Sequence, residues 1–155
     1  MIKRFILAIS IVSACAIAGC SGSNAGPGAE AGGPHGGVFV SLPGEAGVAE
    51  ILTEEEAAAK GQRQRGRTPK SVVVYFLGPD KKTALSPLPT AVGVKFLGAD
   101  SVPAITLGPA PDSKDPSGAG RFASPVGDYD LSGRRAELTA DLGGQKVAQE
   151  FAGPR

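Results

Sequence analysis

The sequence predicts an all-β protein: a single immunoglobulin-like antiparallel β-sandwich of about seven strands, with one short helical excursion. Two observations support this class. The apolar segments after residue 37 are short and rich in Val, Leu, Ile and Phe, and they are bounded by Gly, Pro, Asp and Ser, which form turns. Several of these segments alternate apolar and polar residues, which is the period of a strand with one buried face.

Three strands are expected in the first half of the domain. Residues 38–42 (VFVSL) alternate, so their valines and their leucine share one face. Residues 48–52 (VAEIL) place Ala49 and Ile51 on one face and their neighbours on the other. Residues 71–78 (SVVVYFLG) are apolar at consecutive positions, which favours a central strand buried on both faces.

One segment after the second strand breaks the β pattern. Thr53 and Glu56 fit a capping box, and Glu56 and Lys60 have the i, i+4 spacing of a helical pair. We therefore expect a short helical excursion here, followed by a basic loop from Arg63 to Lys70. The loop is either a solvated excursion between two strands or one half of a docking surface.

The second half supplies the remaining strands. In residues 91–98 (AVGVKFLG) the two central valines and the phenylalanine point inward and Lys95 points outward. Two short strands follow at 104–110 and 120–125. Residues 135–142 (RAELTADL) alternate strictly and lead through a Gly-Gly pair into 145–153 (QKVAQEFAG), which predicts a hairpin with a two-residue turn.

The N-terminus has the features of an export signal. Lys3 and Arg4 precede an apolar stretch at 5–18, which is short for a membrane span. The stretch ends in IAGC, and small residues before Cys20 resemble a bacterial lipobox. This resemblance implies that the cysteine sulfur receives a diacylglycerol, that cleavage occurs before Cys20, and that the new amino group is acylated. Acyl chains of this kind anchor a protein stably in a bilayer.

Three parts follow along the chain. Residues 1–19 are a lipoprotein signal peptide, residues 20–36 are the lipidated cysteine with a flexible Gly/Ser/Ala linker, and residues 37–153 are the β-sandwich domain. The expected location is the cell membrane or the outer membrane, lipid-anchored and facing the periplasm. Ser21 after the cysteine favours the outer membrane, by analogy with enteric bacteria.

The composition excludes several classes of function. Cys15 leaves with the signal peptide and Cys20 carries lipid, so the mature chain has no free thiol for a disulfide, a metal or catalysis. Removal of Lys3 and Arg4 leaves one fewer basic than acidic residue, which does not favour nucleic acid as a partner. The chain has no Walker loop, dinucleotide fingerprint or nucleophile elbow. We therefore expect no cofactor and no enzymatic activity.

His35 is the only histidine and lies in PHGG, before the first expected strand. Three roles are open to it. In a structural role the imidazole hydrogen-bonds to the sheet edge and fixes the first strand. In a metal-binding role it joins Glu50 or Asp residues around copper or zinc. In the third case it is an exposed residue without a role.

Two pairs of carboxylates are further candidates, Asp112 with Asp115 and Asp128 with Asp130. Such pairs can help to bind calcium or perform glycosidase-like acid catalysis. Asp is also an ordinary turn residue, so neither pair by itself predicts a site.

PHGG, VAEIL, VVVYFLGPDKK and AELTADLGGQKVAQEF follow one another in this order. In this order they resemble the small β-sandwich segment of periplasmic adaptor subunits of heavy-metal efflux pumps of the resistance-nodulation-division class, and a group of short bacterial lipoproteins that carry this segment alone. The resemblance covers most of the chain after the linker. It implies the sandwich fold and a connection to metal handling, with His35 matching the motif histidine and Glu50 the glutamate of the second strand. The chain has no helical hairpin, lipoyl-like domain, barrel or methionine-rich metal site, so it cannot act as a pump adaptor alone.

The sequence thus predicts a non-catalytic lipoprotein that displays a β-sandwich for binding or scaffolding in the cell envelope. Its partners are the lipid bilayer, through acylated Cys20, and as a candidate an envelope protein. The alternative is a periplasmic accessory protein of heavy-metal efflux that binds a transition metal through His35 and Glu50.

Overall fold

The computed structural model describes residues 29–55, 68–98, 103–112 and 120–154. In these ranges the chain is all-β, as predicted, with one 3-10 turn at Pro43–Glu45 and no α-helix. The strands are β1 (Ala29–Ala31), β2 (Val38–Ser41), β3 (Val48–Glu55), β4 (Lys70–Leu77), β5 (Val92–Phe96), β6 (Ile105–Pro109), β7 (Gly120–Ala123), β8 (Arg135–Leu142) and β9 (Gln145–Ala152).

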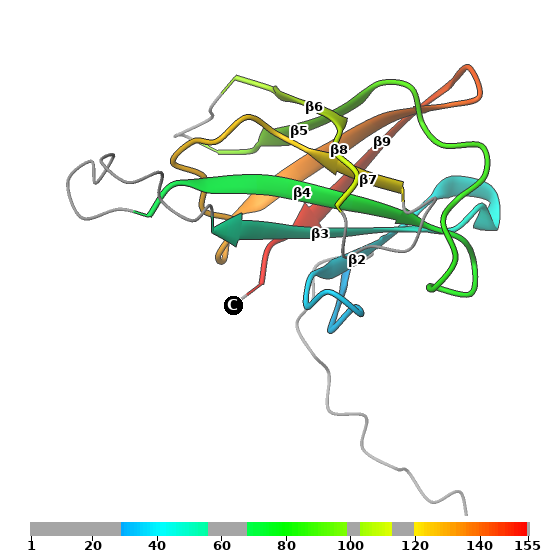
Figure 1. Cartoon of the computed structure of the whole chain (residues 1–155), viewed down its shortest axis with the longest axis horizontal. Coiled ribbons are helices and arrows are strands. Elements are labelled where there is room, and N and C mark those ends of the chain that lie inside the picture. Colours follow the sequence, from blue (N-terminus) through cyan, green and yellow to red (C-terminus); the bar gives the residue numbers. More distant parts are fainter. Residues whose placement is uncertain (1–28, 56–67, 99–102, 113–119, 155) are drawn as a thin grey trace, which may run out of the picture.

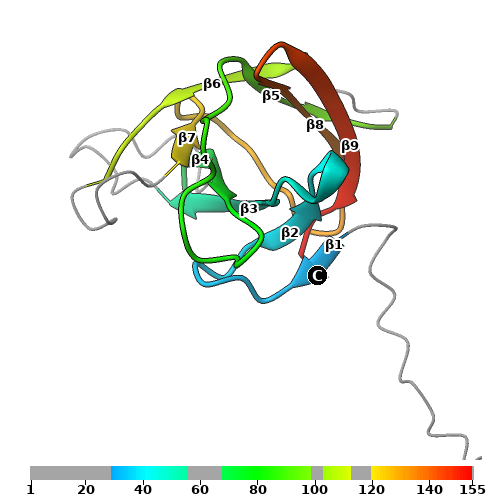
Figure 2. The same cartoon turned by 90° about the vertical axis from the view of Figure 1, so that its right-hand side faces the viewer.

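The strands form one antiparallel sheet in the order β1-β2-β3-β4-β7-β6-β5-β8-β9. In Figure 1 the strands are seen from the side, and in Figure 2, turned by 90°, they are arranged in a ring. The sheet curls until β2 and β9 come into contact, which makes it nearly barrel-shaped. A two-sheet immunoglobulin-like sandwich is not seen in the described residues, because β6 pairs with β7 through Gly108 and Pro109 and joins the two halves.

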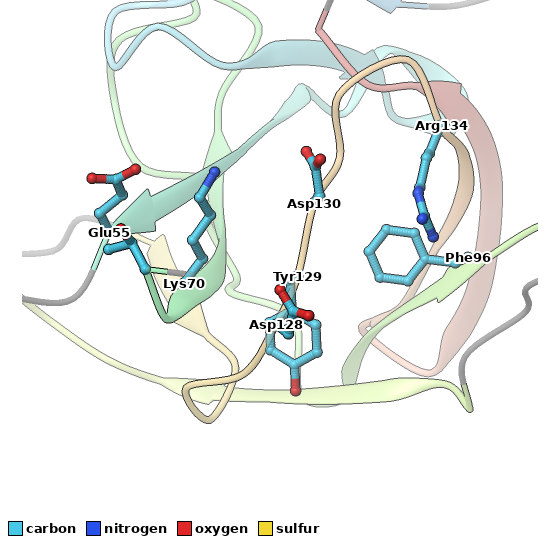
Figure 3. Close-up of a pocket in the computed structure, with 8 residues that line it drawn as sticks. Glu55, Lys70, Phe96, Asp128, Tyr129, Asp130 and Arg134 are labelled. Carbon is cyan, nitrogen blue, oxygen red and sulfur yellow. The ribbon is translucent and has the colours of Figure 1, made fainter. Parts of the chain in front are cut away.

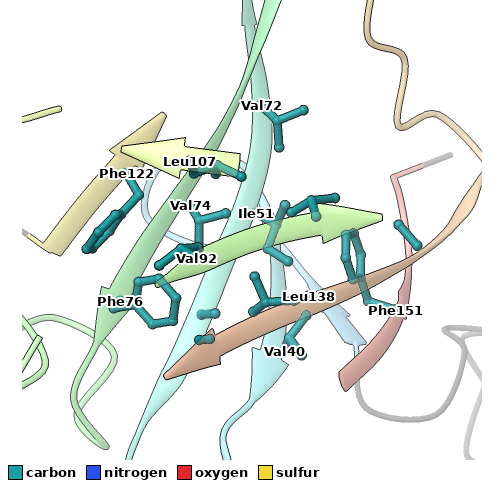
Figure 4. Close-up of a cluster of buried hydrophobic side chains, with 14 of the residues drawn as sticks. Val40, Ile51, Val72, Val74, Phe76, Val92, Leu107, Phe122, Leu138 and Phe151 are labelled. Carbon is teal, nitrogen blue, oxygen red and sulfur yellow. The ribbon is translucent and has the colours of Figure 1, made fainter. Parts of the chain in front are cut away.

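The interior of the ring is filled by the apolar faces that the alternation predicted. Val72, Val74 and Phe76 point inward from β4, and the ring of Phe76 meets that of Phe122 edge-to-face, with centroids 5.5 Å apart. Figure 4 shows this cluster. Other members are Val38, Val40, Leu42, Ala49, Ile51, Val92, Val94, Phe96, Leu107, Leu138 and Phe151.

A second apolar cluster lies on the outer face of β2, β3 and β4. It contains Phe39, Val48, Val73, Tyr75 and Leu77. The strand β4 is therefore buried on both faces and lies between β3 and β7, which confirms the prediction of a central strand.

The C-terminal hairpin is also confirmed. Leu142 pairs with Gln145 across Gly143 and Gly144, whose φ angles are 63° and 91°. Two consecutive residues with positive φ make the turn that matches the twist of the flanking strands, and glycine adopts it without strain. Asp141 reinforces the turn by accepting the backbone N–H of Gly144 at 2.7 Å.

The predicted helical excursion is wrong at its start. Thr53 is not a helix cap, because β3 continues through Glu55 and Thr53 pairs with Val72 of β4. Pairing along the whole length of β4 outweighs the local helical signal of a single capping box. Residues 56–67, including most of the basic loop, lie outside the described residues.

The sheet begins inside the segment predicted to be a linker. Ala29–Ala31 form β1 and pair with β2, so these residues of the predicted linker belong to the sheet. The signal peptide and Cys20 lie outside the described residues. Among the residues that are described, there is no helix with the length and apolar character needed to cross a membrane.

Candidate functional site

Glu50 is the centre of a polar cluster on the outer face of β3. The alternation of the strand turns Ala49 and Ile51 inward, so Glu50 points outward, yet its side chain is 0% exposed. One carboxylate oxygen, Oε1, accepts the backbone N–H groups of His35 at 2.8 Å and Gly37 at 3.0 Å. The other, Oε2, lies 2.8 Å from His35 Nδ1. A buried carboxylate requires such partners, and here one short turn supplies all three.

The glycines of this turn allow the carboxylate to approach the backbone. Gly36 donates its N–H to the carbonyl of Gly33 at 2.9 Å, which closes the turn over Pro34 and His35. A Cβ at Gly33 would collide with the Glu50 carboxylate, and a Cβ at Gly37 would lie 2.7 Å from the carbonyl oxygen of Ile51. The PHGG pattern is therefore a cradle for Glu50, and Gly33 just before it is part of the same cradle.

The cluster extends across the sheet through Tyr75. The imidazole of His35 stacks on the Tyr75 ring, with centroids 3.8 Å apart and planes 4° from parallel. Arg121 of β7 donates from Nε to the Tyr75 hydroxyl at 3.2 Å, from Nη2 to the Glu54 carboxylate at 2.7 Å and from Nη1 to the carbonyl of Ala110 at 2.6 Å. Burial lowers the pKa of Arg121, but the Glu54 carboxylate and the Tyr75 hydroxyl together more than offset this and hold the pKa above its ordinary value.

Sequence reasoning selected His35 and Glu50 but missed Tyr75, Arg121 and Glu54. One weak signal was present, which is the charged residue Arg121 inside the short apolar segment 120–125. The pairing of β4 with β7 is what aligns Tyr75 with Arg121, and alternation within a strand does not predict which strands become neighbours.

The geometry agrees with the structural role for His35, because the residue joins the turn to β3 and β4. Metal binding by His35 and Glu50 stays a prediction. The two side chains are adjacent, but within the described part of the chain no three His, Cys, Asp or Glu side chains are grouped so that they could hold a metal ion. Both oxygens of Glu50 already have hydrogen-bond partners, so a metal ion would have to displace the turn.

A second candidate site lies at one end of the sheet. A pocket of about 390 Å³ is lined by residues that include Asp128 and Asp130, one of the two predicted carboxylate pairs. Figure 3 shows the pocket with these side chains. Asp112 is not among the lining residues, and Asp115 lies outside the described ranges.

Asp130 is held in place at this pocket. Its Oδ1 accepts the backbone N–H of Ser132 at 2.9 Å. The pKa of Asp130 lies below its ordinary value, chiefly because of hydrogen bonds from Ser132 and also because Lys70 and Arg134 are near enough to stabilise its charge.

No protein-family model matches this chain, and no curated protein or solved structure matches it either. The resemblance to efflux-pump adaptor segments therefore stays a prediction from the sequence motifs.

Proposed function

We propose that this chain is a bacterial lipoprotein. Acylated Cys20 anchors it to the cell membrane or the outer membrane, and one non-catalytic β module faces the periplasm for binding or scaffolding. The observation that supports this is the IAGC sequence directly after an apolar stretch, with β1 beginning only nine residues beyond the cysteine. A chain of nine residues spans at most about 30 Å, so the module stays close to the bilayer.

The contacts around Glu50 support a structural role, and not a catalytic one, for His35 and Glu50. The only histidine in the chain forms hydrogen bonds with a buried carboxylate and stacks on Tyr75. A general base must instead be free to reach a substrate or a nucleophile. A binding module that positions its turn through these contacts is therefore favoured over an enzyme.

Metabolic labelling with radioactive palmitate tests the anchor. The chain and its Cys15→Ser variant should both incorporate label and fractionate with membranes. The Cys20→Ser variant should incorporate none, because no other sulfur receives the lipid. Label that persists in Cys20→Ser would overturn the proposal, and so would an unlabelled wild-type chain.

The second candidate is a transition-metal-binding accessory protein related to heavy-metal efflux. The observation that favours it is the 2.8 Å approach of His35 Nδ1 to Glu50. Calorimetric titration of the soluble chain that begins at Ser21 with Cu²⁺ or Zn²⁺ tests it. One metal ion per chain, with binding abolished in His35→Ala, would support this candidate. Heat that is absent, or unchanged in His35→Ala, would remove it.

For the fold, we propose that the two halves of the sheet act as the layers of an immunoglobulin-like sandwich. The support is the single apolar cluster to which both halves contribute. An experimental structure in which β9 pairs with β1 or β2 by a ladder of hydrogen bonds would contradict this and define a closed barrel.

A further inference from the structure

We infer that the pocket at the end of the sheet binds a small zwitterion, a molecule that carries a carboxylate and an ammonium group, such as a short peptide with free termini. This inference names a ligand class for the binding module proposed above and rests on that part of the proposal. It does not depend on the lipid anchor.

The pocket is assembled from segments that are distant in the sequence. Glu55 ends β3, Lys70 begins β4 and Phe96 ends β5, whereas Asp128 to Arg134 come from the connection between β7 and β8. The connection is tied to β4 by two backbone hydrogen bonds between Lys70 and Gly127, at 2.8 and 2.9 Å. Strands therefore position three of the lining residues, and the connection that carries Asp128 to Arg134 is paired with β4 at Gly127. A volume of about 390 Å³ is within the range of small-molecule pockets.

The lining combines charges of both signs. The acidic side chains are Glu55, Asp128 and Asp130, and the basic ones are Lys70 and Arg134. In Figure 3, Glu55 and Arg134 stand on opposite sides, with Asp130 between them. Asp130 is already stabilised by Ser132 and by both cations. Towards the other residues that the structure describes, the side chains of Glu55, Lys70 and Arg134 form no ion pair or hydrogen bond.

This distribution selects against ligands of a single charge. The carboxylates are not grouped as a metal site requires in the described part of the chain. A simple anion can pair with Arg134 but leaves Glu55 without a ligand charge, and a simple cation can pair with Glu55 but leaves Arg134 without one. A molecule with both charges can place its carboxylate at Arg134 and its ammonium at Glu55, while the partly exposed Tyr129 offers apolar surface to its carbon atoms.

The experiment uses the full lipidated chain, labelled with ¹⁵N, in detergent micelles. Alanylalanine is titrated while ¹H–¹⁵N NMR spectra are recorded. We expect saturable shifts of the backbone amides between residues 127 and 134. N-acetylation or C-terminal amidation of the dipeptide should each weaken binding by about tenfold or more, because each removes one charge-assisted contact.

Three variants assign the two charges. Arg134→Gln should bind the free dipeptide and its amide equally well, and Glu55→Gln should bind the free and the acetylated dipeptide equally well. Arg135→Gln is the matched control, because Arg135 neighbours Arg134 but pairs with Glu150 away from the pocket. It should keep the wild-type preference for the free dipeptide.

Two results would overturn the inference. One is the absence of shifts at residues 127–134 with millimolar alanylalanine. The other is equal binding of free and capped dipeptides by the wild-type chain. Either result would leave the palmitate experiment, and therefore the anchor, unaffected.

Discussion

Replacement of Glu50 should destabilise the fold more than replacement of any exposed carboxylate. Glu50 is fully buried and accepts two backbone N–H groups besides its contact with His35. In Glu50→Ala the N–H groups of His35 and Gly37 lose their acceptor, and a cavity opens beneath the turn. In Glu50→Gln the amide oxygen can still accept both N–H groups, and only the charge-assisted contact with His35 is lost.

The magnitudes follow from these contacts. An orphaned buried donor costs about 1–3 kcal/mol, and the N–H of Gly37 is the buried one of the two. Truncating a large buried side chain to alanine costs about 2–5 kcal/mol, because a cavity remains. We therefore expect Glu50→Ala to lower the free energy of unfolding by about 3–5 kcal/mol, and Glu50→Gln by about 1–2 kcal/mol.

Urea unfolding of the soluble chain from Ser21, followed by circular dichroism, measures these losses. Glu150→Ala is the control, since that carboxylate is half-exposed and pairs with the exposed Arg135. A surface pair contributes about 0–1 kcal/mol. The reasoning is refuted if Glu50→Ala costs no more than Glu150→Ala, or if Glu50→Gln costs as much as Glu50→Ala.

Three further predictions concern other parts of the network and one turn. Gly37→Ala should lower the free energy of unfolding in urea by about 1–3 kcal/mol, because the added methyl group overpacks the turn. The control Gly108→Ala should cost far less, because its Cβ meets nothing within 4 Å. Equal losses would contradict the close packing of Gly37 against Glu50 and Ile51. Arg121→Lys should lower the thermal midpoint, because one ammonium cannot reach all three acceptors of the guanidinium; an unchanged midpoint would contradict this. Hydrogen bonds from the backbone N–H groups of Thr83 and Lys82 lower the pKa of Asp80. The Asp80 carboxylate therefore contributes stability above the pKa of the unfolded chain, and this contribution is lost as pH falls through the lower pKa of the folded chain. Asp80→Asn should reduce the loss of stability in acid, and a carboxyl titration by NMR at or above the ordinary Asp value would show the reasoning to be mistaken.

Local patterns predicted most of the strands and their buried faces. In β2 and β5 the alternating apolar residues are the ones that enter the interior, and Gly143-Gly144 forms the expected turn. These predictions succeed because the side-chain period of a strand and the φ range of glycine depend only on neighbouring residues. The helix start predicted at Thr53 is wrong because pairing with β4, a contact between distant residues, overrides a local signal.

The candidate sites depended on the tertiary structure to a greater degree. The sequence motifs named His35 and Glu50, but the contacts with Tyr75 and Arg121 exist only because β4 lies beside β7. The end pocket likewise requires Lys70 and Gly127 to be paired across the sheet.

The sequence by itself determined the all-β class, the positions of most strands and the candidate pair His35 and Glu50. Only the tertiary structure decided the order of the strands, the joining of both halves through β6 and β7, and the burial of Glu50 under a glycine turn. The physical reason is that strand order results from which distant apolar faces can be buried together, a choice made by the whole chain, whereas periodicity records only which face of each strand avoids water.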